Sequence, residues 1–162
     1  MKKRLLILLA VCVSDASAQG ILYLPEPIEN CMLPPPISEN LTVVTALNPF
    51  YLRGDFDGDG QPDHVVLVKS KKSNEEGLLI CFGGRLSLQK LGAGNLFKLA
   101  SGTVVDLKFD SWEIHPKSKA LSAYRERPPV LRGDAIHINW EASASGVIYW
   151  TGKEFAYYLL GD

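Results

Sequence analysis

The acidic stretch RGDFDGDGQPDHVVLV, from Arg53 to Val68, is the most informative segment of the sequence. Within nine positions it carries four aspartates, Asp55, Asp57, Asp59 and Asp63. Carboxylates at this density repel one another unless a positive charge lies among them. The flanking segments "FYLR" and "HVVLVKS" are rich in β-branched and aromatic residues, which favour strands. The stretch therefore predicts a loop between two strands that gathers carboxylates around one point.

The spacing within this loop favours calcium as the positive charge. Counted from Asp55, the aspartates take positions 1, 3, 5 and 9, and position 7 can offer its backbone carbonyl. Hard oxygen ligands in this number suit calcium, which takes roughly six to eight of them. A plain surface turn is the alternative, but such a turn needs only one or two aspartates. We predict a calcium site in residues 55–63 with five ligands: Asp55, Asp57, Asp59, Gln61 and Asp63.

The loop departs from an EF-hand after its sixth residue. Position 12 is Val66, where an EF-hand has a bidentate glutamate, and the flanks indicate strands instead of helices. The missing glutamate predicts modest affinity, in the range of roughly 10⁻⁴–10⁻³ M that extracellular modules use.

Residues Gly54 to Val68 resemble the calcium-binding core of the FG-GAP repeat family, also called VCBS repeats. That family occurs in integrin-type β-propeller blades and in many exported bacterial proteins. The resemblance implies that the loop joins two strands and that the same five residues are calcium ligands. It covers about a tenth of the 162 residues, and the chain has one such loop. Because a propeller needs about four to eight blades, we expect a small standalone β domain.

Short β signals continue to the end of the chain. They include "EGLLICFGG", the alternating segments "GTVVDLKFDSWEI" and "DAIHINW", and a hairpin "SGVIYW-TGK-EFAYYLL". The polar segment "HPKSKALSAYRERPPVLRGD" predicts a long connection. Strands of this length with little helical periodicity indicate antiparallel sheets. We predict a mostly β single domain of short antiparallel strands over residues 41–162, with one strand–calcium loop–strand hairpin.

The first 18 residues have the pattern of a secretory signal peptide. A basic start, the apolar run "LLILLAVCV" and the small residues "ASA" follow in the expected order. The apolar run is too short to span a bilayer, which takes roughly 20 residues. Lipidation of Cys12 is a weaker alternative, because the bulky Val11 precedes it. We expect a periplasmic or secreted protein with no membrane span after signal cleavage.

Prolines dominate the next segment, residues 19–40. They stand at positions 25, 27, 34, 35 and 36, and proline disfavours helix interiors and strand pairing. We therefore expect an extended arm. The following "SENLTVVTALNPF" fits either a short helix capped by Ser38 or a strand, and the sequence leaves both open.

Two cysteines, Cys31 and Cys81, remain after signal cleavage. An even number in an exported chain favours a disulfide slightly over a buried free thiol. The bond would close a loop of about 50 residues and stabilise the fold by roughly 3–4 kcal/mol.

The four residues "LRGD" occur twice, at Leu52–Asp55 and at Leu131–Asp134. The second copy lacks the acidic loop and continues as "AIHINW". Four matching residues are thin evidence for a duplication. Each copy contains the tripeptide RGD of integrin ligands, but tripeptides recur by chance.

Charge and motif content narrow the function. Without residues 1–18 the chain has 14 basic and 17 acidic residues, so nucleic acid is an improbable partner. Three scattered histidines make no zinc site, and the common hydrolase and phosphate-loop motifs are absent. We predict a non-enzymatic module that binds a protein or polysaccharide at the envelope. The alternative is a metal-dependent hydrolase, which needs an open ion site beside a cleft with a polar base.

Overall fold

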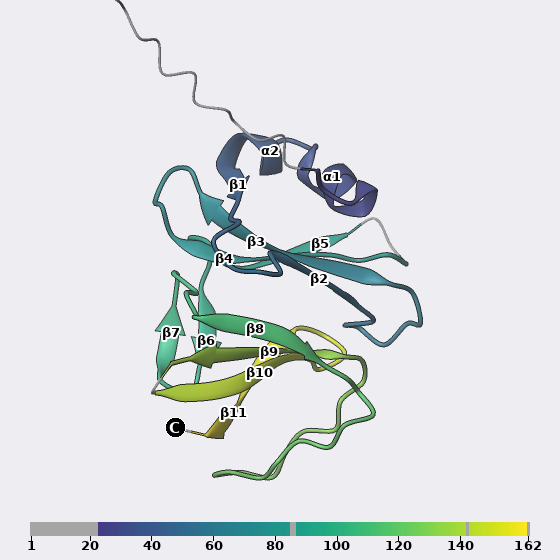
Figure 1. The fold of residues 1–162 in the computed structure, drawn as a ribbon, viewed down its shortest axis with the longest axis vertical. Coiled ribbons are helices and arrows are strands. Elements are labelled where there is room, and N and C mark those ends of the chain that lie inside the picture. Colours follow the sequence, from purple (N-terminus) through teal and green to yellow (C-terminus); the bar gives the residue numbers. More distant parts are fainter. Residues whose placement is uncertain (1–22, 85–86, 142, 162) are drawn as a thin grey trace, which may run out of the picture.

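The computed structural model describes residues 23–84, 87–141 and 143–161, and the expected signal peptide with Cys12 lies outside them. Two antiparallel sheets pack face to face (Figure 1). The first sheet has the order β1-β3-β4-β5, with β2 also paired to β3. Its strands are β1 (Leu41–Val43), β2 (Tyr51–Gly54), β3 (Asp63–Ser70), β4 (Glu76–Cys81) and β5 (Leu88–Gly92).

The second sheet has the order β11-β10-β9-β8. Its strands are β8 (Ser111–His115), β9 (Ala135–Trp140), β10 (Ala144–Trp150) and β11 (Phe155–Gly161). A small pair, β6 (Phe97–Leu99) with β7 (Gly102–Val104), lies between the two sheets in the chain. The predicted small, mostly β domain of antiparallel strands is confirmed.

The main core lies between the inner faces of the two sheets. Strand β3 contributes Val65 and Leu67, and strand β9 contributes Ile136 and Ile138. Residues two apart in a strand point to the same face, so the alternation in "DAIHINW" correctly identified the buried side of β9. The C-terminal hairpin, β10 with β11, also forms where the sequence predicted it.

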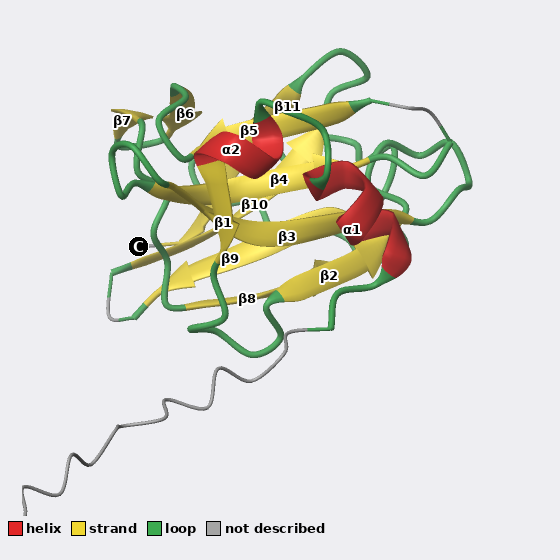
Figure 2. Ribbon diagram, turned by 90° about the horizontal axis from the view of Figure 1, so that it is seen from above, coloured by secondary structure: helices red, strands yellow, loops and turns green. Residues whose placement is uncertain are grey.

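Strand β3 is buried on both of its faces. Its other set of side chains, His64, Val66 and Val68, faces a second apolar cluster beneath two helices (Figure 2). These helices are α1 (Glu26–Met32) and α2 (Ile37–Asn40). A strand covered on both sides reads as a continuous apolar run, which accounts for the sequence "VVLV".

The expectation of an extended proline-rich arm is wrong. Pro25 is the N-cap of α1 and Pro27 lies in its first turn, where the missing N–H of proline costs no helical hydrogen bond. Ile28 on this helix is fully buried against the first sheet. The segment 38–50, for which the sequence left helix and strand open, contains the end of α2 and strand β1. Ser38 lies inside α2 instead of capping it.

The Cys31–Cys81 disulfide is present. It joins α1 to the last residue of β4, with 6.0 Å between the two Cα atoms. That separation lies within the ordinary range for disulfides. The bond fastens the helical cover onto the first sheet.

The segment before β8 differs in part from prediction. Residues 105–110 were expected to continue an alternating strand, but regular pairing begins only at Ser111. Leu107 and Phe109, two residues apart in this alternating segment, are nonetheless both buried in the main core. Instead of pairing, Asp106 accepts a hydrogen bond from the backbone N–H of Glu76.

Residues 116–134 form the predicted long connection between β8 and β9. Leu121 and Leu131 from this connection pack on the outer face of the second sheet. None of the described helices is both long and apolar enough to cross a bilayer.

Candidate metal centre

The acidic loop joins β2 to β3 and is anchored by an aromatic side chain. Phe56, the residue between the first two aspartates, is fully buried in the core between the sheets. Asp63 is the first residue of β3 and pairs with Gly54 across the two strands. The loop is therefore a strand–loop–strand hairpin, as predicted, with its first half fixed by Phe56.

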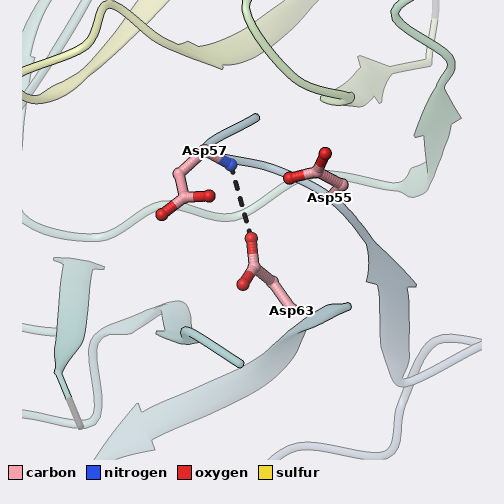
Figure 3. Close-up of side chains that lie close together, drawn as sticks. All are labelled: Asp55, Asp57 and Asp63. Atoms are coloured by element: carbon pink, nitrogen blue, oxygen red, sulfur yellow. Dashed lines mark hydrogen bonds between the residues drawn. The ribbon is translucent and has the colours of Figure 1, made fainter. Parts of the chain in front are cut away.

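Three of the predicted ligands gather at one point. One carboxylate oxygen from each of Asp55, Asp57 and Asp63 lies within 4.8 Å of the other two (Figure 3). Asp59 lies outside this cluster, and its carboxylate rests against Gly84 in the loop after β4. One oxygen of Asp59 accepts a hydrogen bond from the backbone N–H of Gln61 at 2.7 Å.

The backbone of the loop wraps around these carboxylates. Asp55 accepts hydrogen bonds from the N–H groups of Gly58 at 2.8 Å and Gly60 at 3.1 Å. Asp57 accepts one from the N–H of Asp59 at 3.1 Å. Side-chain to backbone bonds of this kind favour tight turns. The acidic side chains therefore fold the loop as well as supplying oxygen ligands.

Asp63 is the most constrained member of the cluster. It is fully buried and accepts three backbone hydrogen bonds, from Phe56 at 2.9 Å, Asp57 at 3.3 Å and Gly83 at 2.9 Å. Burial raises the pKa of its carboxyl group, and these three bonds offset part of that effect. The charge of Asp57 raises the same pKa further. A cation bound in the cluster would instead favour the ionised form.

The second "LRGD" copy packs directly on the acidic loop. The backbone N–H of Asp134 donates to the carbonyl of Asp55 at 2.7 Å, and the N–H of Asp55 donates to the Asp134 carboxylate at 3.2 Å. The tips of both segments are glycines in close contact. A Cβ added at Gly58 would lie 2.4 Å from the carbonyl oxygen of Arg132, and one at Gly133 would lie 2.3 Å from that of Asp55.

This contact was not predicted from the sequence, although the repeated tetrapeptide was a signal that could have suggested it. It places the candidate metal centre where the hairpin of the first sheet meets the segment leading into β9 of the second. The aspartates therefore lie at a junction between the two sheets instead of at a free hairpin tip.

His64 follows Asp63 in β3 but lies on the other side of the sheet. Asp63 shares its face with Val65 in the main core, whereas His64 shares its face with Val66 under α1. Adjacent residues of a strand point in opposite directions. The histidine next in sequence therefore does not face the carboxylate cluster.

No protein-family model, curated protein or solved structure matches this chain. The acidic cluster and the fold around it are consequently the observations on which a function can be argued.

Proposed function

We propose that this chain is an exported β domain that binds one structural calcium ion in the loop 55–63. The observation that carries the proposal is the meeting of three carboxylates, from Asp55, Asp57 and Asp63, around one point. Such a cluster is repulsive when empty, and a divalent cation removes that repulsion. Carboxylate and carbonyl oxygens are the donors that calcium prefers. Asp59 and the backbone carbonyl of Gln61 complete the proposed ligand set.

The surroundings of the cluster favour a structural ion over a hydrolytic one. The Asp63 carboxylate is fully buried and already accepts three backbone hydrogen bonds. His64, the basic residue that follows Asp63 in β3, lies on the opposite face of the sheet. A hydrolase needs an open metal position and a base on the same side as the ion. A clamp at the junction of two sheets needs neither.

The disulfide supports export, because such bonds persist in oxidising compartments such as the periplasm or the exterior. The proposed role in that setting is an envelope module that binds another protein or a polysaccharide. Calcium would hold the acidic hairpin against Gly133 and Asp134 and so fix the position of one sheet relative to the other.

The test is the melting temperature of residues 19–162 in calcium and in chelator. At free calcium 100 times the dissociation constant, binding stabilises the native state by about 2.7 kcal/mol, which is several degrees for a domain of this size. Equal melting temperatures in both conditions would overturn the proposal.

Two neutral variants separate the ligands. Asp57→Asn removes one charge of the cluster and is expected to abolish most of the calcium response. Asp59→Asn, beside Gly84, is expected to weaken the calcium response less. The matched control is Glu154→Gln in the β10–β11 turn, which should leave the calcium response intact. An unchanged response in Asp57→Asn contradicts the site itself, whereas an unchanged response in Asp59→Asn only removes Asp59 from the ligand set.

A further inference from the structure

A pocket of about 930 Å³ lies between helix α1 and the outer face of the first sheet. Its floor is the face of β3 that carries His64, opposite to the face of the carboxylate cluster, and Gln61 and Pro62 at the end of the acidic loop are part of its lining. Its volume is within the range of ligand sites, roughly 300–1,000 Å³. Most of its lining is apolar, and a few polar side chains converge within it, which is the usual composition of a small-molecule site.

The floor of the pocket is one row of side chains across four strands. Arg53 on β2 is paired with His64 on β3, His64 with Cys81 on β4, and Cys81 with Leu88 on β5. Residues directly opposite in antiparallel strands lie on the same face, with Cβ atoms about 4.5–5.5 Å apart. Arg53 and His64 are therefore direct neighbours at one end of the row, and apolar groups form the other end.

These two polar side chains lack protein partners in the described part of the chain. Arg53 is exposed and lines the pocket, and its side chain forms no ion pair or hydrogen bond with a described residue. His64 is only 5 % exposed, and its Nδ1 is buried without a hydrogen-bond partner. A buried polar atom left in this state costs free energy. An unpaired guanidinium beside an unpaired imidazole is a ready binding site for an anion.

The groups around Arg53 and His64 suit a ligand with an apolar part better than a bare inorganic ion. The ring of Tyr51 lies near that of His64, with 6.5 Å between centroids. The disulfide and Leu88 continue the apolar floor. Pro25 and Pro27 on α1 form part of the roof, and the exposed carboxylate of Glu26 stands at its rim, which makes a polyanion a poor match.

We propose that this pocket binds a small organic acid, with one carboxylate held by Arg53 and His64 and the apolar body against Tyr51, Leu88 and the disulfide. The fork of the Arg53 guanidinium takes both carboxylate oxygens, and a ring N–H of His64 donates a further hydrogen bond. Helix α1 closes over the ligand because the Cys31–Cys81 bond holds it in place. The same chemistry is present in a free acid and in the C-terminus of an apolar peptide.

The experiment is a titration followed by two-dimensional NMR with phenylacetate as the probe, in saturating calcium so that the acidic loop is constant. The expected result is a saturable shift of signals from Tyr51, Arg53, His64 and Leu88, with a dissociation constant of about 1 mM or lower. Phenylacetamide and acetate, which lack the charge and the apolar body respectively, bind at least about tenfold more weakly. Equal binding of phenylacetamide, or no saturable shift with phenylacetate, overturns the proposal.

Matched variants locate the carboxylate. Arg53→Gln is expected to weaken phenylacetate binding at least about tenfold, and Arg53→Lys, which keeps the charge but loses the fork, gives an intermediate affinity. The control Arg127→Gln makes the same change at an exposed site in the connection 116–134 and leaves binding unchanged. Equal affinity in Arg53→Gln and Arg127→Gln contradicts the assignment. The calcium-induced change in melting temperature, measured on each variant, shows separately whether the metal loop is intact.

The source of the carboxylate is decided by two acetylated Leu-Phe peptides, one with a free C-terminus and one amidated. If the free peptide binds more tightly than phenylacetate through the same residues, the occupant is a peptide C-terminus. If it binds more weakly, the occupant is a free acid. If the amidated peptide binds as well as the free one, the carboxylate is not what the pocket recognises and the proposal fails.

Discussion

The two sheets of this domain both have a covered outer face, but the covers are built differently. The first sheet lies under helices α1 and α2, and a disulfide fastens α1 to β4. The second sheet lies under the irregular connection 116–134, which contributes Leu121 and Leu131. One hydroxyl holds much of that connection, because Tyr158 donates to the carbonyl of Glu126 at 2.8 Å and accepts from the N–H of Tyr124 at 3.4 Å.

The difference is visible in the strands beneath each cover. Seven of the eight residues of β3 are buried, which needs an apolar layer on both sides. Strand β8 instead alternates exposed and buried positions at its start, as expected for a strand with one wet face. The helical cover therefore buries most of the central strand β3, whereas the irregular cover leaves the edge strand β8 partly solvated.

The largest expected effect on stability comes from removing the disulfide that joins helix α1 to the first sheet. The double substitution Cys31→Ser/Cys81→Ser removes the cross-link over about 50 residues and should lower the free energy of unfolding by about 2–5 kcal/mol. Urea unfolding of the variant beside the wild type measures this. Reduced wild-type protein is the control, and it should match the variant.

Loss of the cross-link should also free α1 from the pocket, so phenylacetate binding weakens in the same variant. If the variant unfolds at the wild-type urea concentration, the disulfide does not hold the first cover and the contrast between the two covers disappears.

A smaller effect is expected from loosening the second cover. Tyr158 is 8 % exposed, and Tyr158→Phe removes its hydroxyl from the backbone groups of the connection. The free energy of unfolding should fall by about 1–2 kcal/mol, the usual cost of a lost buried hydrogen bond. Tyr23→Phe, at a side chain that is 81 % exposed, is the matched control and should change nothing. A loss as large as that of the cysteine variant would mean that both covers are equally fixed.

The smallest expected effect is a pH dependence of the junction between the sheets. Because burial raises the pKa of Asp63, the native state holds this proton more tightly than the unfolded chain does. In chelator, the stability contributed by protonated Asp63 is full below its ordinary pKa near 3.8 and is lost as pH rises through the higher native value. Calcium should oppose this loss by favouring the carboxylate.

The measurement is urea unfolding of the wild type and of Asp63→Asn in chelator at a series of pH values. Subtracting the free energy of unfolding of the variant from that of the wild type cancels the contributions of the other carboxyl groups. A wild-type stability that rises with pH relative to Asp63→Asn would contradict the sign. Repeating the series in calcium shows whether the ion stabilises the ionised form.

Local patterns allowed part of this structure to be predicted. The hairpin around Asp55–Asp63, the C-terminal hairpin and the buried face of β9 depend on residues close in sequence. Helix α1 was not predicted, because proline disfavours helix interiors, yet Pro25 and Pro27 fall at the start of this helix, where proline is tolerated. The pairing of Cys31 with Cys81 was one of two open alternatives.

The remaining features are tertiary and left no local trace. Nothing in the spacing of the aspartates shows that Asp59 turns toward Gly84 while Asp63 is buried under three N–H groups. The row from Arg53 to Leu88 likewise depends on the register of four strands, which a single sequence does not fix.

The contact between Gly58 and Gly133 has a consequence for how this sequence can diverge. A Cβ added at either glycine would collide with the backbone of the opposite segment, and the hydrogen bonds between Asp55 and Asp134 join segments 79 residues apart. An insertion or a larger side chain in either segment would therefore have to be matched in the other. In descendants of this chain, the acidic loop and the second "LRGD" copy should therefore be lost or retained together.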